Sequence, residues 1–324
     1  MKLDDRIDNF TQNTSLYPFL NQLIDYAGIF PPTSLTLDEA IRNYASYQLD
    51  KDSWMLGPFI VQASRLDELD PYITLFSNER PLTISAVGTR TSNPTEYYKG
   101  LLADLKKIDL FLERHGQVVQ ITTLEMPLPP NIPDLNLLNI TSKETMKRGL
   151  QTYCEIPAPL NPEWEETLHK SLDVIATHNS ESPVTLGFKL RTGGVTANTF
   201  PTPRQVAMAI KGCRDRNLAM KFTAGLHHPI RVYREEIGAK MHGFINVFVA
   251  GMLTHLHHLD LPMIEKILAD EEVSNFTFHP NKISWCGLKM TISEIKSLRD
   301  SVLRSYGCCS FNEPREDMKS LNIL

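Results

Sequence analysis

Short apolar runs rich in β-branched and aromatic residues recur along the chain and alternate with segments of helical periodicity. Continuous runs of this kind are typical of strands buried in a parallel sheet. The candidate strands cover residues 56–64, 82–90, 118–125, 151–157, 184–191, 218–224, 243–249 and 276–286, of which the last has the weakest pattern. The candidate helices between them include residues 162–178, 203–217, 230–241 and 261–272.

The alternation of strands and helices predicts a parallel sheet with helical crossovers. Asn161-Pro162 and Thr202-Pro203 have the form of a helix start, in which an N-cap residue precedes proline. Eight strands at this spacing fit an α/β fold of the (β/α)8 TIM-like barrel type better than an open, doubly wound sheet. No G-x-G-x-x-G motif follows the first strand, which weakens the alternative of a dinucleotide-binding domain.

The chain of 324 residues fits one barrel with additions, because no linker or low-complexity tract divides it. Residues 1–54 precede the first candidate strand and contain helix-like segments at about 15–26 and 36–49. We expect these residues to form an N-terminal helical cap. Residues 55–306 then form the barrel, and residues 307–324 are a short tail that packs on it.

The charge balance excludes two classes of partner. Lys plus Arg total 33 and Asp plus Glu total 38, so the formal net charge is −5 and there is no basic field for nucleic acid. No stretch approaches the roughly 18–20 apolar residues that cross a bilayer, and the N-terminus has acids where a signal peptide is basic. We therefore expect a cytoplasmic protein that binds neither nucleic acid nor membrane. A homo-oligomer stays open.

The cysteines are five and dispersed: Cys154, Cys213, Cys286, Cys308 and Cys309. They form no C-x-x-C pair, so neither a disulfide framework nor a zinc ribbon is indicated. Because the doublet at 308–309 has no histidine pattern nearby, we expect reduced thiols and no thiol nucleophile.

Two strand ends carry the candidate chemistry, since a barrel of this type builds its site where strands end and loops begin. Residues 187–194 (GFKLRTGG) end the fifth candidate strand, and residues 221–228 (KFTAGLHH) end the sixth. With a side-chain period of two, the apolar positions face the helices and leave Lys189 and Lys221 pointing into the barrel. The same alternation lets Glu155 on the fourth strand and Asn246 on the seventh face inward.

Two lysines in the barrel interior suggest nucleophilic chemistry. Lowering a lysine pKa from about 10.4 to about 7 takes roughly 4 to 5 kcal/mol. A second ammonium at about 4 Å supplies on the order of 4 kcal/mol at an effective dielectric constant of 20. A lysine adjusted in this way can form a Schiff base with a carbonyl compound. The alternative is that both lysines form structural ion pairs with acids such as Glu155 and Glu125.

The two lysine motifs resemble those of a known family. Residues 189–193 (KLRTG) look like the K-x-x-T-G strand end of class I aldolases of the deoxyribose-phosphate aldolase type, and residues 221–225 (KFTAG) look like that family's second-lysine motif. The resemblance implies that Lys189 forms the Schiff base and that Lys221 lowers its pKa. It extends over one site, and Arg191 inside the first motif departs from the family.

The remaining polar residues suggest an anion site. Arg191 beside Thr192-Gly193-Gly194 can bind a phosphate or carboxylate, because Arg matches such anions bidentately and glycine lets backbone N–H groups approach. His227 keeps the strand phase of Lys221 and can act as an acid or hydrogen-bond donor. A metal site at His227, His228 and Glu155 is the alternative, but adjacent histidines on an extended chain point apart, so we expect no metal and no other cofactor.

These residues predict a lysine-dependent lyase of the retro-aldol type that acts on a small anionic carbonyl compound. The expected catalytic residues are Lys189, Lys221, Glu155 and His227. The expected substrate-binding residues are Arg191, Thr192, Gly193, Gly194, Thr223, His228 and Asn246, together with Asp25 and Tyr26, which a cap over the barrel mouth would present. The alternatives are a metal-dependent lyase or hydrolase and a non-catalytic barrel that binds a small anion.

Overall fold

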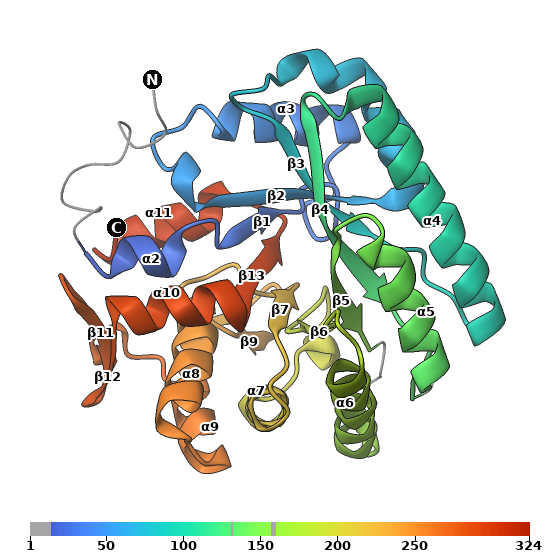
Figure 1. The fold of residues 1–324 in the computed structure, drawn as a ribbon. Helices are drawn as coiled ribbons and strands as arrows, with labels where there is room; N and C mark the ends of the chain where they lie inside the picture. The colour runs from blue at the N-terminus through green and yellow to red at the C-terminus, as the bar shows by residue number, and fades with distance from the viewer. Residues whose placement is uncertain (1–13, 131, 157–159) are drawn as a thin grey trace.

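Eight parallel strands close into a barrel in the computed structural model, which describes residues 14–130, 132–156 and 160–324 (Figure 1). In order around the barrel the strands are β1 (Ile24–Tyr26), β2 (Leu56–Gln62), β3 (Leu82–Val87), β4 (Val119–Pro127), β5 (Gln151–Glu155), β6 (Gly187–Arg191), β7 (Met220–Thr223) and β13 (Leu303–Cys308). The alternation with helices confirms the predicted (β/α)8 TIM-like fold.

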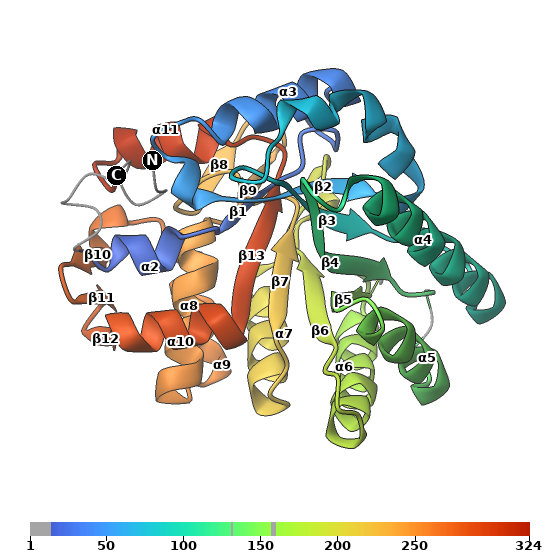
Figure 2. The ribbon, with the colours of Figure 1, turned by 45° about the horizontal axis from the view of Figure 1, so that its top comes forward.

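The helices surround the barrel and cover its outer face (Figures 1 and 2). They are α3 (Leu37–Tyr47), α4 (Pro94–His115), α5 (Leu135–Met146), α6 (Trp164–Glu181), α7 (Pro203–Asp215), α8 (Phe244–His257), α9 (Leu261–Ala269) and α10 (Ile292–Ser301). The predicted helices at 36–49, 162–178, 203–217 and 261–272 are confirmed as α3, α6, α7 and α9. Thr202 accepts a hydrogen bond from the backbone N–H of Gln205, so the N-cap that the sequence indicates does start α7.

Two predicted strands are wrong. Residues 243–249 belong to α8, where every residue from Phe244 to Thr254 is buried. A helix that is buried on all sides shows no amphipathic period, so its apolar run resembles a buried strand. Residues 276–286 form β10 (Phe276–His279) and β11 (Lys282–Trp285), which pair with β12 (Leu288–Thr291) in a small antiparallel sheet outside the barrel.

The two barrel strands that the pattern does not indicate are β1 and β13, which pair with each other. The three residues of β1 lie inside the segment expected to be a helical cap, after the short helix α2 (Leu16–Leu20). The predicted helix at 230–241 is also wrong. It is a hairpin of β8 (Val232–Arg234) and β9 (Ala239–Met241), whose connection includes Gly238 with φ +69°.

The main hydrophobic core lies between the strands and the helices. Phe59, Ile84, Leu124 and Phe222 are completely buried there, and each such side chain stabilises the fold by about 1.5–3 kcal/mol. The last helix, α11 (Asn312–Ser320), packs near α3, with the guanidinium of Arg315 4.2 Å from the ring centroid of Phe311. Because side chains alternate along a strand and the apolar ones face the helices, the polar ones face the barrel interior.

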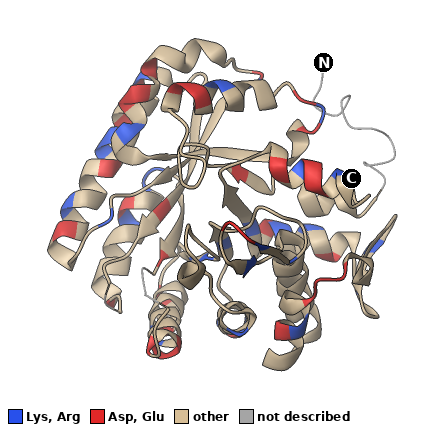
Figure 3. Ribbon diagram, turned by 180° about the vertical axis from the view of Figure 1, so that it is seen from behind, with Lys and Arg blue, Asp and Glu red and all other residues tan. Residues whose placement is uncertain are grey.

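Charged residues of both signs are interspersed along the outer helices (Figure 3). Many pair within one helix, as Lys170 does with Glu166 at 2.5 Å on α6. Within the described parts of the chain, every helix is too short or too polar to cross a membrane.

Candidate active site

A cavity of about 1050 Å³ opens where the barrel strands end, and we name it the carboxyl-end cavity. Its walls include the apolar side chains of Phe30, Ile60 and Trp164. Its polar lining comes from the ends of several strands and the loops after them, and includes Arg90, Glu125, Glu155, Lys189, Arg191, Asn198, Thr199, Thr223, His227 and Cys309. This is the end of the barrel where enzymes of this fold place their sites.

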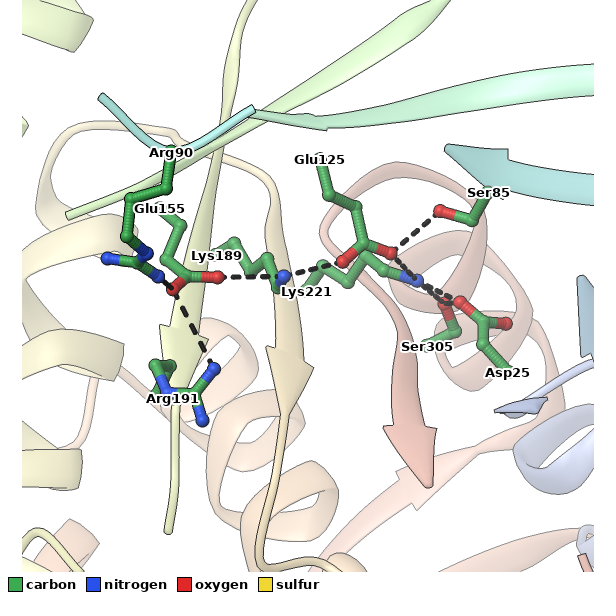
Figure 4. A network of polar contacts seen from close by, with 9 residues as sticks. All are labelled: Asp25, Ser85, Arg90, Glu125, Glu155, Lys189, Arg191, Lys221 and Ser305. Atoms are coloured by element: carbon green, nitrogen blue, oxygen red, sulfur yellow. Dashed lines mark hydrogen bonds and ion pairs between the residues drawn. The ribbon is translucent and has the colours of Figure 1, made fainter. Parts of the chain in front are cut away.

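A line of alternating charges crosses the barrel interior, from Glu155 through Lys189, Glu125 and Lys221 to Asp25 (Figure 4). The amine of Lys189 lies 2.6 Å from Oε2 of Glu125 and 2.8 Å from Oε2 of Glu155. All three side chains are at least 95% buried. Their strands, β4, β5 and β6, are neighbours, and Glu155 pairs in register with Lys189.

The line continues from Glu125 to Lys221. Oε1 of Glu125 lies 3.2 Å from the Lys221 amine and accepts a hydrogen bond from Ser85 at 2.7 Å. The same amine contacts Asp25 on β1 and lies 3.1 Å from Oγ of Ser305. Glu125 therefore joins the two lysines through opposite oxygens of one carboxylate.

The prediction that both lysines point into the barrel is confirmed, since Lys189 and Lys221 lie in register on β6 and β7 and are buried. The alternative of ion pairing describes the resting state, because each amine contacts two carboxylates. The role that the resemblance implies for Lys221, lowering the pKa of Lys189, stays a prediction. Glu125 contacts both amines, Glu155 contacts that of Lys189, and Asp25 contacts that of Lys221.

The pKa of Lys189 is raised. Burial acts against its charge, but the carboxylates of Glu125 and Glu155 outweigh that effect. Burial also opposes the charged form of Glu155, yet Lys189, Arg191 and Arg90 lower its pKa to about 2. At neutral pH Glu155 is therefore ionised and faces the ammonium of Lys189.

The pKa of Lys221 moves the other way. Burial and then the guanidinium of Arg304 lower it to about 7. Lys221 and Asp25 line a different cavity, of about 1030 Å³, at the opposite, amino-terminal ends of the strands. We name it the amino-end cavity.

Two arginines at the carboxyl-end cavity approach Glu155. Nη2 of Arg90 lies 2.9 Å from Oε1 of Glu155, and Nη1 of Arg191 lies 3.8 Å from the same atom. Both guanidinium side chains are about half exposed, at 55% and 48%. Sequence reasoning missed Arg90. The signal was its place at the end of the second candidate strand, where polar residues are informative.

No protein-family model and no curated protein sequence matches this chain. A closed parallel barrel with polar groups at the carboxyl ends of its strands is a scaffold that enzymes commonly use. The chemistry has to be inferred from the site itself.

The structure places part of the loop after β6 at the cavity, as expected for substrate-binding residues. Gly193 and Gly194 line the carboxyl-end cavity, as does Thr223. A Cβ on Gly193 would lie 2.8 Å from the Cα of Gly225, so the two loops approach more closely than side chains allow. Thr192 is buried and donates its hydroxyl to the carbonyl of Ala224 at 2.5 Å, which ties the ends of β6 and β7 together.

The two histidines after β7 separate. Nδ1 of His227 lies 2.9 Å from Glu313, whereas Nδ1 of His228 lies 2.5 Å from Asp317. Only His227 of the pair lines the carboxyl-end cavity. Among residues 14–130, 132–156 and 160–324, no group of three or more His, Cys, Asp or Glu residues is arranged to hold a metal ion. The structure does not bring His227, His228 and Glu155 together as a ligand set.

Three other expected binding residues lie away from the carboxyl-end cavity. Asn246 was expected on a strand but lies on α8. Its Oδ1 accepts from the backbone N–H of Arg231 at 2.9 Å, and its amide donates to the carbonyls of Ile267 and Asp270 at the end of α9. Tyr26 is buried and stacks on Tyr44 with ring centroids 6.5 Å apart. Asp25 faces Lys221 as part of the interior line instead of capping the mouth.

Proposed function

We propose that the chain is a lysine-dependent lyase of the retro-aldol type, which acts on a small anionic carbonyl compound in the carboxyl-end cavity. The observation that carries this proposal is the Lys189 amine, held between Glu125 and Glu155 where it lines that cavity. An amine in contact with two proton acceptors has both the nucleophile and the base that imine formation requires.

The charge around the cavity supports an anionic substrate. Lys189, Arg90 and Arg191 supply three positive charges, while Glu125 and Glu155 supply two negative ones. The half-exposed guanidinium groups can leave Glu155 for a carboxylate or phosphate, which they would bind more fully in two-point contacts.

Substrate binding also provides a way to activate the lysine. Arg90 and Arg191 are among the charges that hold the pKa of Glu155 at about 2. An anion that neutralises the two guanidinium groups raises the proton affinity of Glu155. Glu155 then accepts a proton from Lys189 across their 2.8 Å contact, and the neutral amine forms only when substrate is in place.

The chemical steps follow from the neutral amine. Nζ of Lys189 bonds to the carbonyl carbon, and the carbonyl oxygen takes up protons and leaves as water. In the iminium that results, the hydroxyl group on Cβ loses its proton, the Cα–Cβ bond breaks, and the Cβ fragment leaves as a carbonyl compound while the electron pair of the broken bond forms an enamine. A proton added to Cα converts the enamine to an iminium, and water hydrolyses it to release the second product and the amine of Lys189. Glu155 is the group placed to shuttle protons.

Borohydride trapping with pyruvate, a small anionic carbonyl probe, tests the proposal. Hydride reduces an imine to a stable amine, so peptide mass spectrometry should locate an adduct on Lys189. Lys189→Met should abolish it. Lys221→Met should leave the attachment point and shift adduct formation to higher pH, because Lys189 then meets the carboxylate of Glu125 without a competing amine. Lys170→Met, on the surface of α6, is the matched control and should change nothing.

An adduct on Lys221 would exchange the two roles. No adduct on either lysine with pyruvate would overturn the Schiff-base mechanism for this probe class and favour the second candidate, a non-catalytic barrel that binds small anions. The observation behind that candidate is the complete ion pairing of both lysines. It is distinguished by tight pyruvate binding that survives Lys189→Met.

A further inference from the structure

A second group of reactive side chains lines the carboxyl-end cavity and takes no part in the lysine chemistry. Cys309 follows β13 and His227 follows β7, and these strands are neighbours in the barrel. Sγ of Cys309 lies 4.0 Å from both ring nitrogens of His227. The hydroxyl of Thr33 donates a hydrogen bond to the same sulfur at 2.9 Å. A thiol is therefore paired with an imidazole at a cavity wall.

A third residue orients the imidazole. Nδ1 of His227 lies 2.9 Å from Oε2 of Glu313 on α11. This arrangement matches the roles found in thiol catalysis, in which an acid orients the base and the base pairs with the nucleophile. Here Glu313 is the acid, His227 the base and Cys309 the nucleophile. Cys309 and Glu313 are close in the sequence, whereas His227 precedes Cys309 by 82 residues and is brought beside them by the pairing of β7 with β13.

The charges in this group favour a thiolate. Burial opposes an ionised thiol, but His227 and the hydroxyl of Thr33 together lower the pKa of Cys309. Burial also opposes a charged imidazole, yet Cys308, Cys309 and Glu313 raise the pKa of His227 above its ordinary value. The titratable groups near Cys309 include His227 and Tyr26, while Glu313 and Cys308 both contact Nδ1 of the imidazole, Cys308 at 3.9 Å.

We propose that Cys309 is a second nucleophile of the carboxyl-end cavity, a thiolate that adds to the carbonyl carbon of a small anionic aldehyde. The sulfur lone pair forms the S–C bond, and the carbonyl π electrons move to oxygen. That oxygen takes a proton from the His227 imidazolium, which leaves a neutral hemithioacetal and a neutral imidazole. The preference for an anion rests on the proposed function, because it uses Arg90 and Arg191. The reactivity of Cys309 does not.

The first experiment measures alkylation by iodoacetamide at pH 6, followed cysteine by cysteine with peptide mass spectrometry. Cys286 is exposed and serves as an internal reference. At pH 6 only about 0.3% of a thiol with an ordinary pKa near 8.5 is ionised, so Cys309 should react on the order of tenfold faster than Cys286. Equal or slower labelling of Cys309 in the folded protein would overturn the proposal.

Variants separate the imidazole from the general surroundings. His227→Gln removes the cation beside the sulfur and should shift the pH of half-maximal labelling upward, with loss of most of the advantage at pH 6. His228→Gln is the matched control, because the neighbouring ring contacts Asp317 instead. Cys308→Ser, which removes a thiol that is absent from the cavity lining, should leave a reactive Cys309. If His227→Gln and His228→Gln behave alike, the thiol–imidazole pair is not the cause.

The second experiment tests the ligand class by protection. Glyoxylate, a small anionic aldehyde, should slow iodoacetamide labelling of Cys309 at lower concentration than neutral glycolaldehyde. The protection should persist in Lys189→Met, which forms no imine at that position. Loss of protection in Lys189→Met would assign the effect to the lysine and overturn the aldehyde role of Cys309. If only the lysine proposal is wrong, iodoacetamide still labels Cys309 faster than Cys286 and glyoxylate still protects it.

Discussion

The two ends of the barrel have cavities of nearly equal volume, about 1050 Å³ and 1030 Å³, and each has one of the two interior lysines in its lining. Their surroundings differ. At the carboxyl end, Arg90 and Arg191 approach a carboxylate at the cavity. At the amino end, the buried Arg299 donates to the backbone carbonyls of Leu303 and Asn21. Cavity volume does not distinguish the two ends, whereas the half-exposed guanidinium groups of Arg90 and Arg191 do.

The two ends also differ in the pKa of the lysine that each contains. Lys189 and Lys221 are neighbours in register, yet the pKa of the first is raised and that of the second is lowered to about 7. Both amines are buried and contact two carboxylates, but Glu125 and Glu155 raise the pKa of Lys189, whereas burial and then the guanidinium of Arg304 lower that of Lys221. Glu125 is the one carboxylate that contacts both. The predictions below test how far the two ends are independent.

The largest effect is expected from Glu125→Ala, because Glu125 joins the two ends. Its removal takes a charge partner from two buried amines at once. Breaking a buried ion pair from one side destabilises proteins by about 3–5 kcal/mol. Urea unfolding should show a loss of that order, and Glu166→Ala, which removes a surface partner of Lys170, should show no measurable change. A loss as small as the control's would mean that water already solvates the interior line.

The next largest effect on the unfolding free energy is expected at the carboxyl end of the barrel, from Glu155. The pKa of Glu155 is about 2 in the folded protein and 4.5 in its ordinary state. A depressed carboxyl pKa stabilises the fold above the ordinary value and loses that contribution as the pH falls through the folded value. The difference in unfolding free energy between the protein and Glu155→Gln should thus shrink by about 3 kcal/mol between pH 4.5 and 2.

Urea titrations of the two proteins from pH 2 to 6 measure this difference. Glu166→Gln, whose ion pair with Lys170 is exposed, should show no comparable dependence. A flat difference for Glu155→Gln would mean that the arginines and Lys189 do not act on Glu155 in solution, and it would remove the trigger that we propose for Lys189.

The contribution of each lysine to the unfolding free energy should depend on pH in a different way. Between pH 7 and 10, unfolded chains keep the proton of Lys221 and the folded protein has released it. Unfolding free energy relative to Lys221→Met should therefore rise with pH, by about 1.4 kcal/mol per unit at most. The raised pKa of Lys189 predicts a constant difference from Lys189→Met up to about pH 10, and a fall beyond it. If the unfolding free energy relative to Lys221→Met is also constant below pH 10, Asp25 keeps Lys221 charged.

The fold could be predicted because most strands and helices show their own periodicity, and an inward lysine pair follows from alternation on two strands. The errors concern segments where burial removes the pattern. The helix α8 is apolar on every side, and the barrel strands β1 and β13 are short or carry polar residues such as Arg304 and Ser305.

The thiol group was missed for the same reason. His227 was recognised at a strand end, and the doublet Cys308-Cys309 was noted as lacking a nearby histidine. With β13 unassigned, nothing in the sequence places Cys309 beside the strand that ends before His227. Glu125 was considered only as an ion-pair partner, because its two-sided contact depends on the distances across the barrel.

The smallest effect is expected at the rim of the carboxyl-end cavity, where Arg191→Lys keeps the charge and removes the planar fork. A lysine offers a point charge in place of two parallel donors, so two-point binding of a carboxylate is lost. We expect the pyruvate concentration needed for half-maximal borohydride trapping to rise about tenfold, which corresponds to about 1.4 kcal/mol. The adduct should stay on Lys189.

Arg204→Lys on α7 is the matched control, since its side chain is similarly exposed and pairs with Glu265 at 3.8 Å, away from the cavity lining. Its trapping curve should match that of the unaltered protein. An unchanged curve for Arg191→Lys would assign anion binding to Arg90 alone. Because Arg90 makes the shorter contact with Glu155, that result would also make Arg90 the guanidinium whose capture by substrate frees Glu155 to accept the proton of Lys189.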